Sequence, residues 1–410
     1  MVYLPHFPIP NKNSISNNSP EKLRKILLKL GNPQDQLPPT IHIAGTNGKG
    51  STAAFLASIF QAANYKTHIY TSPHLHHCNE RIVVANNQID DGYLYEMLEE
   101  IRITAGEINL TLFEGLTLAA ILAFSKNPAD ICIIETGMGG RVDATNVIDK
   151  KIATILTAIS FDHQEFLGNN LFAIACEKSH IMRPNIPCII APQNQEIITA
   201  IEQRSAEISN QLIYLDNDLP IPKPALEGAH QYVNAALAIT TINNISGFKI
   251  SQTDINNGLK NVKWSSRLEK LNHSLLKPDD ELWIDGAHNQ AGFEVLANWI
   301  SEKIADDETK KPKRNYLITG FSKNKSKPEF FLPFKDIIDF ICTVRVAGEP
   351  NAEQAEVILE KILEAGIEEV KNEDDLFDAI NFLVNLDSEN PCRIIICGSL
   401  YLARDVRNKS

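Results

Sequence analysis

Short apolar runs alternate with longer amphipathic stretches through the first half of the chain. The runs have the length of buried strands, and stretches such as Tyr93–Ala105 and Thr117–Ser125 space their apolar residues as helices do. Near-continuous apolar strands separated by helices are typical of a mostly parallel sheet with helices on both faces. The strands predicted in this way are Ile41–Ala44, Thr67–Thr71, Ile131–Glu135, Ala153–Thr157 and Cys188–Ala191.

A second series of strands and helices begins near residue 281. The polar stretch Leu271–Asp280 precedes it, and we interpret that stretch as the junction between two domains. We expect domains of residues 1–268 and 269–410, with a ligand site where the two meet. The elements predicted in the second domain are strands Leu282–Ile284, Tyr316–Ile318, Phe340–Val344 and Arg393–Cys397 and helices Glu353–Ala365 and Asp374–Asn385.

Composition excludes several classes of protein. A net charge of −12 argues against sequence-independent binding of nucleic acid, which needs a basic surface. No apolar run approaches the roughly 20 residues of a membrane span. The stretch Met1–Pro8 lacks the charged and apolar parts of a signal peptide. Seven scattered cysteines without a CxxC pair indicate buried thiols in a reducing compartment, so we expect a cytoplasmic protein.

A glycine-rich segment lies between the first predicted strand and a helical pattern. A strand, a glycine turn and a helix start together make a phosphate site, because backbone N–H groups and the helix N-terminus attract an anion. Lys49 would add a full charge, and Ser51 a hydroxyl near a magnesium ion. The spacing departs from the usual P-loop, and the alternative is an ordinary turn with a solvent lysine. The segment reads Gly45-Thr46-Asn47-Gly48-Lys49-Gly50-Ser51.

Polar residues follow several of the other predicted strands. Glu135 opens a second glycine-rich turn, where a carboxylate is placed to hold magnesium. Glu135 could instead be a capping or salt-bridged residue. His163, which follows the strand Ala153–Thr157, could be a metal ligand or a general base, and the alternative is a structural histidine. Lys178 lies about one helix length further on, where a lysine would ordinarily be a surface residue. In the second domain, polar groups gather at strand ends in Asp285-Gly286-Ala287-His288-Asn289 and Gly398-Ser399-Leu400-Tyr401. Such groups at strand ends are placed to meet a ligand.

Taken together, these segments resemble the folylpolyglutamate synthase/dihydrofolate synthase family, which is related to the Mur peptide ligases. The matching segments run in order across nearly the whole chain. They are His42–Ser51, Thr71-Ser72-Pro73-His74-Leu75, Leu110-Thr111-Leu112-Phe113-Glu114, Glu135–Asn146, Asp162–Gly168, Glu177-Lys178, Arg267-Leu268-Glu269, Asp285–Asn289 and Gly398-Ser399.

The resemblance implies an α/β enzyme with an N-terminal P-loop-type domain and a smaller C-terminal Rossmann-like domain. Its activity would be ATP-dependent ligation of L-glutamate to dihydropteroate or to folates such as tetrahydrofolate, through an acyl phosphate. It also implies two magnesium ions and a lysine carbamate at Lys178. The roles carried over are phosphate binding by Thr46, Asn47, Gly48, Lys49, Gly50 and Ser51; other ATP contacts by Asn234, Arg267 and Asp285; metal binding by Ser72, Glu135, His163 and Lys178; catalysis by Lys49, His163 and Lys178; pterin contacts by Thr111, Phe113 and Asp143; and glutamate contacts by His288 and Ser399.

Two departures from the family pattern concern the second domain. Ser265-Ser266 stands where the family has Pro-Gly, and Lys323-Asn324-Lys325 where it has Asp-Lys-Asp, so the local turn and part of a loop are expected to differ. One alternative is a Mur-type ligase of cell-wall synthesis, and another is a nucleotide-binding regulatory module without catalysis. Small-molecule partners and a monomer are expected from the resemblance.

Overall fold

A computed structural model describes residues 19–216, 218–307, 312–387 and 389–407. The stretch Met1–Pro8, which was expected not to be a signal peptide, lies outside these residues. The chain forms two compact units. The first contains the described residues up to Ala225 and then Gln231–Lys263, and the second contains Leu226–His230 and the described residues from Trp264 onward. Within the described ranges, every helix is too short or too polar to span a membrane.

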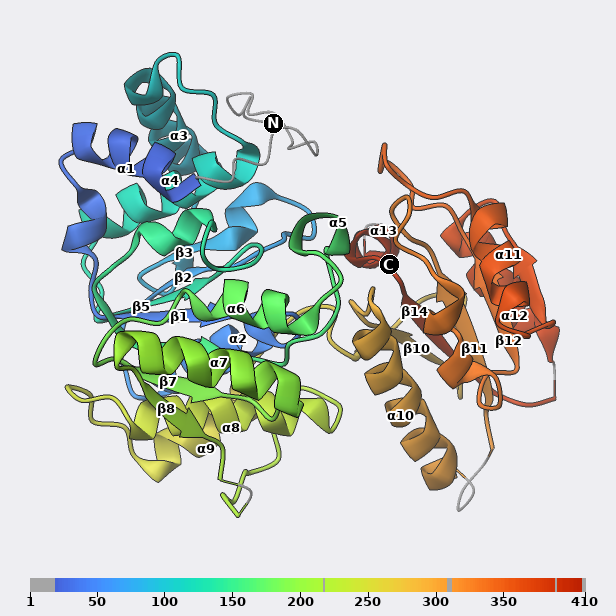
Figure 1. Ribbon diagram of the computed structural model, residues 1–410. Helices are drawn as coiled ribbons and strands as arrows, with labels where there is room; N and C mark the ends of the chain where they lie inside the picture. Colours follow the sequence, from blue (N-terminus) through green and yellow to red (C-terminus); the bar gives the residue numbers. More distant parts are fainter. Residues whose placement is uncertain (1–18, 217, 308–311, 388, 408–410) are drawn as a thin grey trace. The chain divides into compact units, whose positions relative to one another are not determined.

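The first unit is built on an eight-stranded sheet in the order β4-β3-β2-β5-β1-β6-β7-β8 (Figure 1). Six neighbouring strands are parallel, in the order β2-β5-β1-β6-β7-β8. At the β2 edge, β3 and β4 are added antiparallel. The bounds are β1 Thr40–Ala44, β2 Thr67–Tyr70, β3 Ile82–Val84, β4 Asn87–Gln88, β5 Ile131–Glu135, β6 Lys151–Leu156, β7 Pro187–Ile190 and β8 Gln211–Tyr214.

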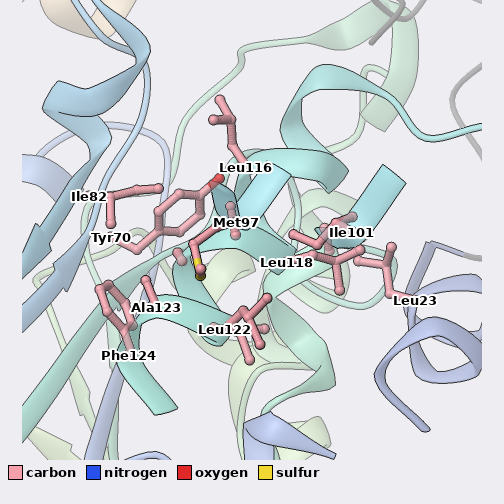
Figure 2. Close-up of a cluster of buried hydrophobic side chains, with 14 of the residues drawn as sticks. Leu23, Tyr70, Ile82, Met97, Ile101, Leu116, Leu118, Leu122, Ala123 and Phe124 are labelled. Atoms are coloured by element: carbon pink, nitrogen blue, oxygen red, sulfur yellow. The ribbon is translucent and has the colours of Figure 1, made fainter. Parts of the chain in front are cut away.

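Helices cover both faces of this sheet, as the apolar runs predict. The longer helices α1, α3 and α4 cover the β2–β5 region, α6 and α7 cover β6 and β7 on the near side of Figure 1, and α2 contacts β1, β2 and β5. Figure 2 shows Tyr70 and Ile82 of the sheet buried among side chains of α1, α3 and α4. The bounds are α1 Ser19–Lys29, α2 Lys49–Ala62, α3 Asp91–Ala105, α4 Leu112–Lys126, α5 Gln164–Leu167, α6 Leu171–Ser179, α7 Gln195–Ile208, α8 His230–Asn243 and α9 Gln252–Asn261.

The second unit has a six-stranded sheet in the order β13-β12-β11-β14-β10-β9. All pairs are parallel except β9–β10. Leu317 and Ile395 share a buried cluster with α10 and α11, while their neighbours Tyr316 and Ile394 are equally buried on the other face. The bounds are β9 Glu269–Leu271, β10 Glu281–Ile284, β11 Arg314–Thr319, β12 Phe340–Thr343, β13 Val370–Asn372, β14 Cys392–Cys397, α10 Gln290–Asp307, α11 Ala355–Glu364, α12 Leu376–Leu386 and α13 Leu400–Arg407.

The mixed α/β architecture with two sheets is therefore the predicted one. The polar stretch Leu271–Asp280, however, is not the junction between the units. It connects β9 to β10, which pair antiparallel in the same sheet, and both strands lie inside the second unit. A polar connection between two strands of a hairpin has the same composition as a linker, so the sequence does not distinguish the two.

Candidate active site

The glycine-rich segment forms a tight turn between β1 and α2. Gly45 and Gly48 have φ of +153° and +90°, values that favour glycine. A Cβ atom on Gly45 would overlap the hydroxyl of Thr157, and one on Gly48 would overlap the side-chain oxygen of Asn234. Gly48 also has no side chain to cap α2, so the first N–H groups of the helix are left for another acceptor. The turn therefore has the backbone geometry of an anion site.

The residues that were expected to hold phosphate are distributed around this turn. The backbone N–H groups of Thr46 and Asn47 donate to the carbonyl of Ala158, at 2.8 and 3.2 Å. The Thr46 hydroxyl donates to the carbonyl of Ser160 at 3.0 Å. Gly50 and Ser51 lie buried in the first turn of α2. The loop is thus fixed to the segment after β6, next to the start of the helix.

Lys49, Glu135 and Ser72 come together at the carboxyl ends of β1, β5 and β2. The Lys49 ammonium donates to the Thr46 carbonyl at 3.0 Å and lies 3.9 Å from Oε1 of Glu135. The other carboxylate oxygen accepts from the backbone N–H of Ser72 at 3.2 Å. Glu135 is buried, and it is paired in register with Ile43 on the next strand. A carboxylate and a nearby hydroxyl are the hard oxygen donors that magnesium takes.

Lys178 lies on α6 and is buried against the same turn. Its ammonium donates to the carbonyl of Gly45 at 2.8 Å. Burial, and then the charge of Lys49, lower its pKa to about 7, although acidic neighbours such as Asp162 and Asp143 act in the opposite direction. A lysine in this state is partly the free amine near neutral pH, and the amine is the form that adds CO₂. The site therefore fits a lysine carbamate chemically.

His163 is placed differently from the other residues expected to bind metal. It stands immediately before α5 with φ of +49°, and its ring nitrogens lie 3.7 Å from Asp162 and 3.8 Å from Glu165. Across the described part of the chain, no three His, Cys, Asp or Glu side chains form a metal-ligand group. A metal ion at the glycine turn would therefore need a mixed set of ligands that includes the Ser72 hydroxyl and Lys178.

Among the expected pterin contacts, Thr111 and Phe113 lie at the start of α4. The Thr111 hydroxyl accepts from the backbone N–H of Glu114, and the Glu114 carboxylate accepts from that of Thr111, which makes a capping box. The Phe113 ring lies so close to Gly137 that a Cβ there would overlap it. Phe113 therefore borders the glycine-rich loop that follows Glu135.

Asp143 is buried within that same loop. Its carboxylate accepts from the backbone N–H groups of Met138 and Thr145, both at 2.9 Å. Burial raises its pKa, while these hydrogen bonds act in the opposite direction. The Thr145 hydroxyl also donates to Asp143 and lies 2.8 Å from Nε2 of His42. His42 and Thr145 stand in two of the family-like segments, but neither was singled out from the sequence.

Asn234 is brought to the glycine turn by α8. It is buried, its side-chain oxygen lies over Gly48, and its amide donates to Gln231 at 3.0 Å. Gln231 is fully buried and was not singled out from the sequence. A buried amide facing the turn is consistent with the expected ATP contact.

In the second unit, Arg267 and Asp285 lie close together at the end of β10. Asp285 accepts from the backbone N–H groups of Leu268 and Ala287, at 2.9 and 2.8 Å. The Arg267 guanidinium lies over Gly286 and donates to the Ser266 carbonyl at 2.9 Å. Both charges act on His230, a neighbour that the sequence did not single out: burial lowers its pKa, Asp285 opposes that effect and Arg267 adds to it.

The expected departures and the glutamate contacts also lie in this unit. Ser266 has φ of +59°, a conformation that glycine adopts more easily, at the position where the family has Pro-Gly. The His288 ring hydrogen-bonds to the Gly286 carbonyl at 2.7 Å, and the Ser399 hydroxyl accepts from the backbone N–H of Tyr401 at 3.3 Å. Asn324 has φ of +63°, and its N–H donates to Glu353. No direct contact between His288 and Ser399 is among the hydrogen bonds of these described residues.

Two family models match the chain. The Mur ligase middle domain matches residues 43–219, and the dihydrofolate synthetase C-terminal domain matches residues 269–409. The probable dihydrofolate synthetase of Schizosaccharomyces pombe is 30% identical over 413 residues, which cover 94% of this chain and 96% of that protein. The dihydrofolate synthase/folylpolyglutamate synthase of Bacillus subtilis is 29% identical over 430 residues, covering 95% and 94%.

A solved structure shows the same fold. The folylpolyglutamate synthase of Mycobacterium tuberculosis, in complex with ADP and AMPPCP, has a TM-score of 0.85 and 26% identity, covering 95% of this chain and 94% of that one. A parallel sheet with this glycine turn, together with the second α/β unit, defines a ligase of the Mur superfamily. The chain belongs to the folylpolyglutamate synthase/dihydrofolate synthase family. It is an ATP-dependent ligase of folate metabolism that adds L-glutamate to dihydropteroate, to folates or to both, and the cell-wall alternative is not favoured.

Proposed function

We propose that this chain catalyses both reactions of its family, adding L-glutamate to dihydropteroate and then to reduced folates. The Bacillus subtilis relative is named for both activities, and it matches nearly the full length of the chain. The observation that carries the proposal is the grouping of Lys49, Glu135, Ser72 and Lys178 around one glycine turn. A site that only bound a nucleotide would not need all four.

The charges of this group suit phosphoryl transfer to a carboxylate. Two anions must approach each other in that reaction, so positive charge must lie between them. Lys49 would supply part of it at the phosphates. Glu135 and Ser72 would hold one magnesium ion, which supplies further positive charge when bound. The solved M. tuberculosis relative is in complex with ADP and AMPPCP, which supports nucleotide binding by this chain.

Lys178 would contribute as a carbamate. Its free amine loses a proton and bonds to the carbon of CO₂, so a cation becomes an anion that can ligate metal. The buried position beside Gly45 and the lowered pKa support this step. We propose His163 as a ligand of a second magnesium ion, for which the adjacent Asp162 would orient the ring.

The remaining roles follow the family resemblance. Asn234, Arg267 and Asp285 would contact ATP, Thr111, Phe113 and Asp143 the pterin, and His288 and Ser399 the glutamate. The first unit would be the ATP-binding domain and the second unit the C-terminal ligase domain. We further propose a monomer that works in the cytoplasm. Light scattering after size-exclusion chromatography would test the monomer, and a dimer mass would exclude it.

One assay tests the main proposal. Purified protein would be given ATP, magnesium and labelled glutamate, with dihydropteroate or tetrahydrofolate in separate reactions, and ADP release and labelled product would be measured. We expect product in both reactions and none without the pterin substrate. Product in one reaction alone would leave a monofunctional ligase. ATP binding without glutamate-dependent turnover would overturn the enzyme assignment in favour of a regulatory module.

A further inference from the structure

His42 is a buried histidine to which none of the proposed roles is assigned. It lies on β1, three residues before Gly45, and its side chain is fully buried. Its Nε2 lies 2.8 Å from the Thr145 hydroxyl. Burial lowers its pKa well below the usual value, and the charges of Lys151 and Arg183 act in the same direction. The ring is therefore neutral and carries a single N–H.

The hydrogen bonds fix which nitrogen carries that proton. The Thr145 hydroxyl donates its hydrogen to the Asp143 carboxylate, so its oxygen is left to accept from Nε2–H of His42. Among the described residues, none provides a hydrogen-bond partner for Nδ1. The chain of bonds thus runs in one direction, from His42 to Thr145 to Asp143.

Asp143 connects these hydrogen bonds to the glycine-rich loop after Glu135. One carboxylate oxygen accepts from Thr145, and the other accepts from the backbone N–H of Met138 at 2.9 Å. The preceding residue, Gly137, lies directly against the ring of Phe113. The three side chains therefore hold the part of the loop that touches Phe113.

The other half of the same loop is held by α6. The backbone N–H of Arg141 donates to the carbonyl of Glu177 at 3.0 Å, and a Cβ on Gly140 would lie 2.6 Å from the carbonyl oxygens of Glu177 and Lys178. The loop thus extends from the Phe113 ring to the backbone of Lys178. Only its first half depends on the side chains of His42, Thr145 and Asp143 among the contacts described.

We propose that His42 and Thr145 are positioning residues for the folate substrate, and that they act through Asp143 by fixing Gly137 and Met138 against Phe113. The inference rests on the proposed role of Phe113 in pterin binding. Neither residue touches a reacting atom. A buried network that ends on a carboxylate has one satisfied arrangement, so the loss of a donor changes what the loop presents to the ligand.

The experiment uses pairs of variants of the full chain. Thr145→Val keeps the shape and removes the hydroxyl, whereas Thr145→Ser keeps the hydroxyl. His42→Leu removes the donor, whereas His42→Gln places an N–H near the position of Nε2. His68→Leu is the matched control. His68 is a buried histidine on β2 of the same sheet, and its Nε2 hydrogen-bonds to the Asn127 carbonyl and not to Thr145.

We expect Thr145→Val and His42→Leu to raise KM for dihydropteroate about tenfold or more, and KM for ATP by less than about twofold. Thr145→Ser and His42→Gln should stay close to wild type, and His68→Leu should leave both KM values unchanged. If His42→Leu does not fold, the nearly isosteric Thr145 pair still decides the question.

Three results would overturn the inference: equal KM values for Thr145→Val and Thr145→Ser, a parallel rise in both KM values, or the same KM change in His68→Leu. Wild-type turnover is measured in the same assay. Its absence would refute the proposed function, whereas an active wild type with indistinguishable Thr145 variants would refute this inference alone.

Discussion

The two units arrange the polar residues at their strand ends in different ways. In the first unit, Lys49 and Lys178 both point at the glycine turn, donating to the carbonyls of Thr46 and Gly45. The charge of Lys49 helps to lower the pKa of Lys178. In the second unit, both carboxylate oxygens of Asp285 accept from backbone N–H groups, one from Ala287 in the same turn and one from Leu268 in the segment before β9.

This comparison distinguishes two kinds of residue: Lys49 and Lys178, which are placed for a ligand, and Asp285, which also stabilises the fold. A buried lysine beside a second lysine on one turn reduces stability, and such groupings are characteristic of functional sites. A carboxylate that accepts from two N–H groups stabilises its loop whether or not ATP is bound. We therefore expect substitutions in the first unit to affect turnover most, and those at Asp285 to affect folding as well.

The largest effect is expected for Lys49→Ala. Removal of the charge at the phosphates should lower kcat/KM for ATP about 10²–10³-fold, while the melting temperature stays equal or rises. Steady-state ADP release and thermal melts measure the two quantities. Lys25→Ala, an exposed lysine on α1, is the control and should behave as wild type. A Lys49→Ala protein with normal activity would remove the distinction between the units.

Lys178→Met should separate function from stability. Because the folded pKa is about 7 and the unfolded value is 10.5, the unfolded chain binds more protons between these values, and wild-type stability should rise with pH in that interval. The variant should lose most turnover, gain on the order of 3 kcal/mol of unfolding free energy at pH 7, and show a flatter pH profile.

Urea titrations at several pH values between 7 and 10 would measure this profile. Wild-type stability that does not change over the interval would contradict the buried, neutral lysine. Retained turnover in Lys178→Met would exclude the carbamate, whatever the stability.

Asp285→Asn tests the second unit. The variant keeps one acceptor oxygen but replaces the other with a donor that faces an N–H group, so the unfolding free energy should fall by about 1–3 kcal/mol. Denaturant unfolding measures this loss, and KM for ATP in the same preparation measures the proposed contact. Asp336→Asn, at an exposed position, is the control. A raised KM with unchanged stability would show that Asp285 serves the ligand alone.

The smallest effect is expected for Thr111→Ala, which removes the N-cap of α4. The loss should be about 1 kcal/mol of stability, and Thr111→Ser should restore it because the hydroxyl remains. Chemical unfolding of both variants provides the comparison. If KM for the folate substrate rises in Thr111→Ala and also in Thr111→Ser, Thr111 has a contact beyond its capping role.

Much of the fold follows from the sequence because apolar strands and glycine turns are local signals. The predicted strands Ile41–Ala44 and Ile131–Glu135 lie within or coincide with β1 and β5. The short edge strands β3 and β4 were not predicted, since two or three residues show no periodicity. The three-residue β9 was missed for the same reason, and the polar residues after it were therefore assigned to a linker.

Part of the candidate site could likewise be predicted from the sequence, and part could not. Parallel strands bring their carboxyl ends to one edge, so the approach of Lys49 to Glu135 follows from strand positions alone. Lys178 lies on a helix, and only the family resemblance indicated it. In the sequence, His42 is only one residue of an apolar run. Its hydrogen bond is to Thr145, 103 positions away, and such a contact leaves no local pattern from which the role of His42 could be predicted.

The place of β14 in the second sheet has a consequence for synthesis. This strand is the last of its sheet to be made, yet it lies between β10 and β11 and pairs with both. A nascent chain released between residues 319 and 392 would carry two strands, β10 and β11, with open edges and no partner to join them. The ribosome must therefore deliver the second unit almost whole before its sheet can close, whereas all eight strands of the first sheet have been made by residue 214.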